Sequence, residues 1–302
     1  MNSRIIPAGA AILGIAALFI TCARAAEPKS FIYSKDAGEY GVGTLTLPEK
    51  QCGREEAVLV IHGGGWSGGN RPSFEGVAVH FTERLGFASF NIEYRLAGPE
   101  ENGKTPWPAC GDDCIAAAEW MFGPEFAEAA GFSPKKIWIC GASAGGHLAL
   151  WTGLHLPAEK VAGIISISGV ADPLPDYAVH HKRYSNLFGG HEPSPEEFES
   201  MSIMSLVKPG CPRILLTHET DDTVVPIESA RHFYEAYLQA GNDIRFYEYS
   251  RSEYEGLTGH CIWIPKSRPH RLIPSLELEI GSFVGSPIEP MRSSKPSGSS
   301  EF

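Results

Sequence analysis

Short apolar runs alternate with longer amphipathic runs between residues 57 and 285, and this alternation limits the fold more than any other feature. The apolar runs, such as "AVLVIH", "KIWICG" and "VAGIISISG", are rich in Val and Ile, whereas the runs between them have helical spacing. Strands that are apolar along their whole length are typical of a parallel sheet covered on both faces. The pattern predicts an α/β fold with a mostly parallel central sheet of about eight strands and helices on both faces.

Two stretches depart from this alternation. The early stretch "FIYSKDAGEYGVGTLTLP" indicates an antiparallel hairpin at an edge of the sheet. Residues 172–206 are proline-rich, and we expect them to be irregular and to form a small cap-like insertion between two strands. Such an insertion often faces the substrate, although an ordinary surface excursion explains the composition equally well. We expect one domain over residues 30–286, since a chain of this length can fold around a single core.

The segment "IHGGGWSGGN", residues 61–70, contains five glycines and lies between a predicted strand and a predicted helix. Nucleotide-binding loops share this position, but the segment lacks their G-x-G-x-x-G register and their G-K-[ST] ending. "HGGG" after an early strand is instead typical of a loop whose backbone N–H groups help to form an oxyanion hole. We predict Gly64, Gly65 and Ala144 as the donors of that oxyanion hole.

Other residues of this segment suggest structural roles. We expect His62 to brace the loop through its ring nitrogens rather than to transfer a proton. Trp66 either forms a wall of the pocket or anchors the loop. Gly68 and Gly69 allow the chain to turn into the next helix.

"GASAGG", residues 141–146, places Ser143 in a G-x-S-x-G motif. The predicted strand "KIWIC" comes directly before the motif and the predicted helix "GGHLALW" directly after it. A strand, a sharp turn and a helix are the context that a nucleophile elbow requires. A serine hydroxyl is a weak nucleophile that needs an adjacent base, and the base needs an orienting acid. The motif predicts Ser143 as a catalytic nucleophile.

Candidates for the acid and the base follow the serine in the chain. "LLTHETDDTVVP" ends a predicted strand and carries two neighbouring carboxylates, of which we favour Asp222 over Asp221 as the acid. Asp172 is a further alternative. "GLTGHCIW" places His260 in a loop before the last helix, and we favour it as the base over His270. We expect the other histidines to be structural or exposed to solvent: His147, His155, His180 and His181.

Six motifs together resemble the α/β-hydrolase superfamily: "HGGGW", "IEYRL", "WPACGDD", "GASAGGHLAL", "DDTVVP" and "GHCIW". The chain looks like its branch of bacterial secreted carboxylesterases, which includes hormone-sensitive-lipase-like enzymes, acetyl-xylan esterases and feruloyl esterases. The resemblance covers about residues 55–285. It implies an α/β-hydrolase fold with Ser143 as nucleophile, Asp222 as acid and His260 as base, and it implies a structural role for Asp113 and for the Tyr-Arg pair of "YRL".

The chain departs from the family pattern in three places. Glu219 stands where the family usually has glycine, and it adds a negative charge near the acid. The interval between Asp222 and His260 is long for the family. Residues 265–273 form an unusual basic insert before the last helix.

The predicted residues indicate hydrolysis of carboxylic esters, with short acyl groups or carbohydrate-linked esters as substrates. An arylformamidase or a peptidase-type amide hydrolase uses the same three residues, and a non-catalytic binding protein can share the fold. The net charge of −11 argues against nucleic acid and against stable association with an anionic membrane. No cysteine–histidine cluster has zinc spacing, so we expect neither a metal nor another cofactor. No feature indicates an oligomeric state.

The two ends of the chain have compositions unlike the domain between them. Residues 1–25 combine Arg4, an apolar run and the small-x-small pattern Ala23-Arg24-Ala25, which predicts a secretory signal peptide and a secreted or periplasmic protein. A retained anchor or a lipoprotein cysteine at Cys22 are the alternatives. Residues 287–302 are rich in Ser, Pro and Gly and predict a disordered tail.

The six cysteines after the predicted signal peptide permit disulfides in such a compartment. Cys110 and Cys114 are close enough in the sequence to pair, although their spacing is not decisive. Cys140 lies in an apolar strand, and we expect it to be a buried free thiol.

Overall fold

The computed structural model describes residues 26–49, 55–250, 260 and 272–285. The predicted signal peptide, the predicted tail, Cys22, Cys52, Cys261, His270 and most of the basic insert therefore lie outside the described residues. Within the described part of the chain, no helix is long and apolar enough to cross a membrane. No group of three or more His, Cys, Asp or Glu in that part is arranged to hold a metal ion.

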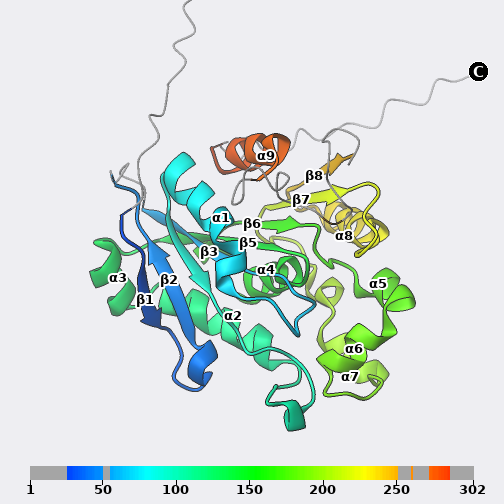
Figure 1. The fold of residues 1–302 in the computed structure, drawn as a ribbon. Helices are drawn as coiled ribbons and strands as arrows, with labels where there is room; N and C mark the ends of the chain where they lie inside the picture. The colour runs from blue at the N-terminus through cyan, green and yellow to red at the C-terminus, as the bar shows by residue number, and fades with distance from the viewer. Residues whose placement is uncertain (1–25, 50–54, 251–259, 261–271, 286–302) are drawn as a thin grey trace, which may run out of the picture.

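An eight-stranded sheet runs through the molecule in the order β1-β2-β4-β3-β5-β6-β7-β8 (Figure 1). β2 is antiparallel to both β1 and β4, and every other neighbouring pair is parallel. The predicted sheet and its antiparallel edge hairpin are confirmed. The strands are β1 Lys29–Ile32, β2 Val42–Thr46, β3 Glu56–Ile61, β4 Ala88–Ile92, β5 Lys136–Ala142, β6 Val161–Ile167, β7 Ile214–Glu219 and β8 Ile244–Tyr249.

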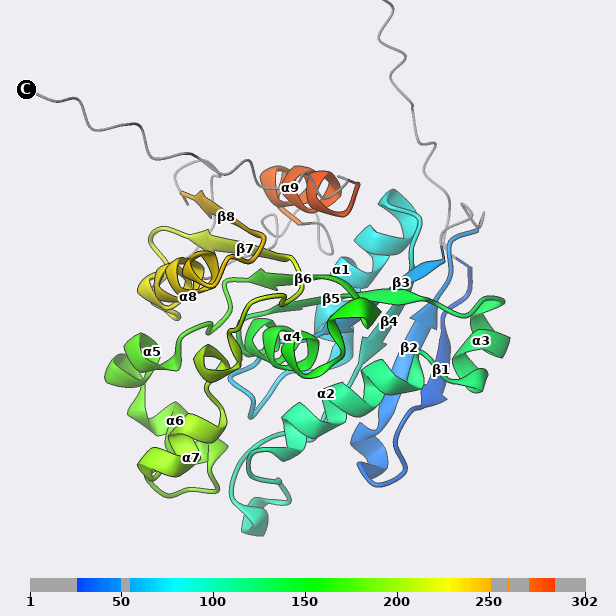
Figure 2. The same ribbon diagram turned by 180° about the vertical axis from the view of Figure 1, so that it is seen from behind.

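Helices cover both faces of this sheet, with α1 and α9 on one side and α2, α4 and α8 on the other (Figures 1 and 2). Successive residues of β5 alternate between two apolar cores: Ile137 and Ile139 pack on the side of α2 and α4, while Trp138 and Cys140 pack on the side of α9. This explains why the strand is apolar throughout. The helices are α1 Glu75–Val79, α2 Ala109–Trp120, α3 Pro124–Ala130, α4 Ala144–His155, α5 Pro173–Val179, α6 His181–Leu187, α7 Pro195–Ser200, α8 Glu228–Gln239 and α9 Pro274–Gly285.

The insertion at residues 172–206 is helical, so the expectation of an irregular segment is wrong. It contains α5, α6, α7 and the 3-10 turn Ile203–Leu206, and its helices lie together at one end of the molecule (Figure 2). Pro173 and Pro195 each occupy the first position of a helix, where the missing N–H costs nothing. Two of the prolines that suggested irregular chain therefore begin helices.

Cys110, Cys114 and Cys140 are all buried free thiols. The expectation for Cys140 is confirmed, and Cys110 does not pair with Cys114.

Candidate active site

Ser143 occupies the sharp turn between β5 and α4. Its backbone angles are φ 57° and ψ −127°, a region that residues other than glycine rarely adopt. The Ser143 N–H donates to the carbonyl oxygen of Ile167 at 2.9 Å, which ties the turn to the end of β6. A strained serine held between a strand and a helix is the elbow geometry that the G-x-S-x-G motif predicts.

Gly145 lets this elbow lie directly against the end of β3. A Cβ atom at Gly145 would lie 2.4 Å from the carbonyl oxygens of both Ile61 and His62, closer than atoms can approach. Only glycine fits without moving one of the two segments. The contact sets the distance between Ser143 and the glycine-rich loop, which begins at Gly63.

The glycine-rich loop closes on itself through its second glycine pair. The Gly68 N–H donates to the Gly64 carbonyl oxygen at 2.9 Å. Gly69 has a φ of 84°, and a Cβ atom there would lie 2.2 Å from the Gly63 carbonyl oxygen. The pair thus forms a tight turn that brings the chain back over Gly63 and Gly64, which agrees with the expected turn towards the next helix.

His62 braces the loop as expected. Its Nδ1 donates to the carbonyl oxygen of Gly63 at 2.7 Å, and its ring stacks on Tyr94 with the centroids 4.2 Å apart. The Tyr94 hydroxyl donates to the His62 carbonyl oxygen at 3.0 Å. Arg95, the next residue of the "YRL" motif, forms an ion pair with the buried Asp113 at 2.6 Å. Both residues of that Tyr-Arg pair, together with Asp113, therefore act structurally.

Trp66 anchors the loop and does not form a wall of the pocket. Its side chain is fully buried, and it lies edge-on to the ring of His147. The indole Nε1 donates to Nδ1 of His147 at 3.3 Å, and Nε2 of His147 donates to the Met201 carbonyl oxygen at 2.8 Å. Burial lowers the pKa of His147 to about 4, so this histidine is a neutral structural residue, as expected.

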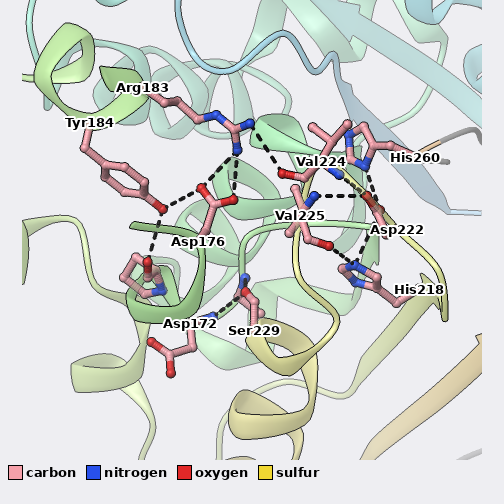
Figure 3. A network of polar contacts seen from close by, with 12 residues as sticks. Asp172, Asp176, Arg183, Tyr184, His218, Asp222, Val224, Val225, Ser229 and His260 are labelled. Carbon is pink, nitrogen blue, oxygen red and sulfur yellow. Dashed lines mark hydrogen bonds and ion pairs between the residues drawn. The ribbon is translucent and has the colours of Figure 1, made fainter. Parts of the chain in front are cut away.

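Asp222 and His260 meet although 38 positions separate them in the chain (Figure 3). Nδ1 of His260 lies 2.7 Å from Oδ2 of Asp222, whose side chain is fully buried. The other carboxylate oxygen accepts the backbone N–H groups of Val224 at 2.8 Å and Val225 at 2.9 Å. Burial alone would raise the pKa of Asp222, but the hydrogen bonds from His260 and from the two N–H groups outweigh it and lower the pKa.

The competing acids occupy other environments. Asp221 is exposed on the turn after β7. Asp172 caps α5 by accepting the Leu174 N–H at 3.0 Å, and its other oxygen lies 2.9 Å from Nδ1 of His232. Asp222 is the carboxylate that lies 2.7 Å from Nδ1 of His260.

One cavity of about 430 Å³ brings the predicted residues together. Ser143 and His260 both line it, as do Gly64 and Gly65. Ala144 is buried at the first turn of α4, directly after Ser143. The remaining lining residues are Gly63, Gly69, Ser73, Phe74, Ala142, Ile167, Ser168, Arg183 and Val224. The cavity lies where the parallel strands β3, β5, β6 and β7 end, the edge at which α/β sheets bind ligands.

Two residues that the sequence did not assign to the site hold the candidate acid and the candidate base. The carboxylate of Glu219, which is fully buried, accepts the backbone N–H of His260 at 2.9 Å. His260 has a φ of 64°, so the chain adopts a strained conformation there. Nε2 of His218 donates to the Val225 carbonyl oxygen at 3.0 Å and lies 3.5 Å from Asp222 Oδ2. The unusual glutamate in "THETDD" was the only signal for either contact.

Arg183 is the third residue that the sequence did not indicate. It comes from α6 of the insertion, and it lines the same cavity as Ser143 and His260. The insertion thus contributes a side chain to the site, which favours the cap-like interpretation over an ordinary surface excursion.

Comparison with known proteins shows the family of this chain. Residues 44–237, more than half of the chain, match the family model described as BD-FAE. The chain belongs to the BD-FAE family. Both the fold and this family membership agree with the resemblance of the sequence motifs to α/β-hydrolases.

Individual relatives match this BD-FAE chain over shorter segments. It is 39% identical over 104 residues to an AB hydrolase superfamily protein of Schizosaccharomyces pombe, a match that covers 34% of this chain and 28% of that protein. It is 28% identical over 137 residues to the versiconal hemiacetal acetate esterase of Aspergillus parasiticus, which covers 43% of this chain and 40% of that one. The chain thus spans well under half the length of these relatives.

Solved structures share the fold over most of the BD-FAE chain. A truncated carbohydrate esterase from gut microbiota superposes with a TM-score of 0.68 at 20% identity, covering 87% of this chain and 96% of that chain. An esterase of Thermogutta terrifontis gives a TM-score of 0.63 at 23% identity, covering 84% and 90%. These similarities establish the α/β-hydrolase fold.

Proposed function

We propose that this protein is a serine hydrolase that cleaves carboxylic esters. The observation that carries the proposal is the single cavity lined by Ser143, His260 and the glycine-rich loop, with the buried Asp222 bonded to His260 Nδ1. Because Nδ1 is engaged by the carboxylate, Nε2 is the ring nitrogen left to accept a proton from the serine hydroxyl. Membership of the BD-FAE family and the esterases among the relatives support ester substrates.

The reaction follows from these positions. The Ser143 hydroxyl oxygen attacks the acyl carbon while His260 takes its proton, and the developing oxyanion accepts N–H groups of Gly64, Gly65 and Ala144. His260 then returns the proton to the leaving alcohol, which leaves an acyl-serine. Water attacks the acyl-serine with the same base and releases the acid. Asp222 holds the imidazole orientation and stabilises the imidazolium throughout.

The substrates that we propose are short acyl esters or esters linked to carbohydrates. The cavity of about 430 Å³ is small enough for a short acyl group beside a larger alcohol, and one structural neighbour is described as a carbohydrate esterase. We also propose that residues 1–25 direct the chain to the periplasm or the outside, where such esters occur. An arylformamidase or a peptidase-type amide hydrolase would use the same triad and is the alternative.

Ser143→Ala tests the mechanism directly. We expect the variant to lose hydrolysis of p-nitrophenyl acetate and butyrate and to lose labelling by a fluorophosphonate probe, with an unchanged melting temperature. Ser200→Ala, at an exposed serine of α7, is the matched control and should behave as the parent protein. Ester hydrolysis that survives in purified Ser143→Ala protein would refute the proposal. Rates on matched acetyl esters and N-formyl amides separate the esterase from the formamidase.

A further inference from the structure

Arg183 stands out among the groups that line the cavity. It is the only described lining residue whose side chain carries a permanent charge, and it comes from the insertion rather than from the sheet. Its side chain lies over Gly65: the position that a Cβ atom would take at Gly65 is 3.9 Å from Cγ and 4.0 Å from Nε of Arg183. The guanidinium therefore stands beside the loop that we assign to the oxyanion.

Hydrogen bonds to Asp176 and to Val224 hold the guanidinium in place (Figure 3). Nη1 donates to both carboxylate oxygens of Asp176 at 2.9 Å, and Nη2 reaches the Val224 carbonyl oxygen at 3.4 Å. Asp176 is fully buried and also accepts the Tyr184 hydroxyl at 2.9 Å. Nε of Arg183 donates to no group in the described residues. A donor fixed in place, with an N–H left over, suits the recognition of an oxygen acceptor.

The charges around the cavity decide what kind of acceptor fits. The single positive charge of Arg183 is already balanced by Asp176 in an ion pair at 2.9 Å. Asp222 adds a second buried carboxylate, whose lowered pKa keeps it ionised. A substrate with its own carboxylate would meet more negative than positive charge, whereas a neutral hydroxyl, ether or carbonyl oxygen gains a hydrogen bond without that repulsion.

We propose that Arg183 is the substrate-recognition residue of this cavity and that it donates to a neutral oxygen of the ester substrate beyond the scissile group. The proposal rests on the proposed ester hydrolysis and names the substrate chemistry of the same site. It gives the insertion a function, since α5 supplies Asp176 and α6 supplies Arg183. It also predicts a preference for neutral, oxygen-rich alcohols over apolar or anionic alcohols.

Three acetyl esters of equal ring size test this preference: cyclohexyl acetate, a monoacetylated methyl pyranoside and the uronic acid that corresponds to the pyranoside. We expect the parent protein to have its highest kcat/KM on the neutral pyranoside. Arg183→Met should lower that value about 10- to 100-fold, the effect of losing a charge-assisted hydrogen bond, and should change kcat/KM on cyclohexyl acetate less than about threefold. On the pyranoside, the kcat/KM of Arg183→Lys should lie between those of the parent protein and of Arg183→Met.

Loss of Arg183 alone leaves Asp176 without its cation, so a double variant is needed. Asp176→Asn combined with Arg183→Met removes both charges, and we expect the same loss of selectivity with recovered thermal stability. An equal loss on cyclohexyl acetate in both variants would show a structural role and overturn the proposal. So would unchanged pyranoside hydrolysis, or a parent protein that prefers the uronate. A parent protein without esterase activity, or an active Ser143→Ala, would instead overturn the proposed function itself and the Arg183 proposal with it.

Discussion

The two halves of the candidate site are built by different kinds of contact. On the nucleophile side, Ser143 and the glycine-rich loop are positioned by backbone atoms packed against backbone atoms, as Gly145 shows at the end of β3. On the base side, polar side chains from the end of β7 hold Asp222 and His260 in place. The nucleophile side therefore depends on close packing, and the base side depends on hydrogen bonds.

Each half also contains a buried histidine, and the two histidines differ in their surroundings. On the nucleophile side, His147 has one nitrogen accepting from Trp66 and the other donating to Met201, so a second proton would disrupt the pair with the indole. On the base side, His218 lies 3.5 Å from the Asp222 carboxylate. Burial lowers the pKa of both residues, and a carbonyl oxygen opposes that shift in each, Met201 in His147 and Val225 in His218. In His218 the Asp222 carboxylate opposes the shift as well. The nucleophile side is thus more sensitive to acid.

Asp222→Asn should have the largest effect, and that effect should be confined to catalysis. An amide cannot stabilise the imidazolium, and it allows the wrong tautomer of His260, so we expect kcat to fall by about 10⁴-fold. The packing of Ser143 and the loop should stay unchanged, since the contacts of Asp222 in the described residues are with Val224, Val225, His218 and His260. Steady-state kinetics and melting temperature measure the two effects. Asp221→Asn, at the exposed neighbour, should retain full activity; an equal loss there would reverse the assignment of the acid.

Gly145→Ala should damage the nucleophile side through packing. The new Cβ would lie 2.4 Å from two carbonyl oxygens, so β3 and α4 must separate. We expect the free energy of unfolding to fall by about 3 kcal/mol, at the upper end of typical overpacking costs, and the activity to fall with it. Gly285→Ala is the control, because a Cβ there meets no atom within 4 Å. If Gly145→Ala keeps the parent stability in urea denaturation, the backbone contact does not determine the position of the elbow.

The backbone geometry around Ser143 could be predicted from the sequence because its determinants are local. A strand, "GASAGG" and a helix are adjacent in the chain, and the steric demand for glycine can be inferred from the motif itself. The apolar alternation likewise predicts the sheet, since each strand carries its own pattern. The sequence could not distinguish between the two roles of Trp66, because the contact with His147 joins residues 81 positions apart.

The base side was predicted less completely, because the contact that holds His260 joins it to Glu219, 41 positions away in the chain. Asp222 and His260 were proposed from their order, which does not show the contacts that position them. The insertion was misjudged because proline is ambiguous: it ends regular structure in most places and begins helices in the first turn. Arg183 could not be found from the sequence, since only the fold brings α6 to the cavity.

Acid should weaken the nucleophile side in a defined pH range. The pKa of His147 is lowered from its usual 6.5 to about 4, so between these values the unfolded chain binds a proton that the folded chain does not. The contribution of His147 to stability is therefore complete above about pH 6.5 and is lost as the pH falls towards 4, by about 3 kcal/mol in total. Urea denaturation at several pH values measures the slope. His147→Gln, which cannot be protonated, should reduce the dependence of the free energy of unfolding on pH. The same slope in the variant and the parent protein would show that other groups are responsible.

Glu219→Ala should have the smallest effect, and it tests whether a side chain positions the base. Without the carboxylate, the His260 N–H loses its 2.9 Å partner and the strained φ of 64° loses its support. We expect kcat to fall about tenfold, the equivalent of one such hydrogen bond, with KM and melting temperature little changed. Glu219→Gln keeps an oxygen acceptor and should restore most of kcat.

Glu219→Gln distinguishes a positioning role of Glu219 from an effect of its negative charge. If Glu219 acts through the hydrogen bond to the His260 backbone, Glu219→Gln resembles the parent protein, and the pH–rate profile changes little. If it acts through its negative charge, Glu219→Gln resembles Glu219→Ala and the profile shifts. Glu248→Ala removes a carboxylate from the neighbouring strand β8, where it pairs with Arg231 at 2.8 Å rather than with His260, and should leave kcat unchanged. A tenfold loss of kcat in Glu248→Ala as well would mean that the base side responds to any negative charge at the end of the sheet. The two halves of the site would then differ in their electrostatics rather than in packing against hydrogen bonding.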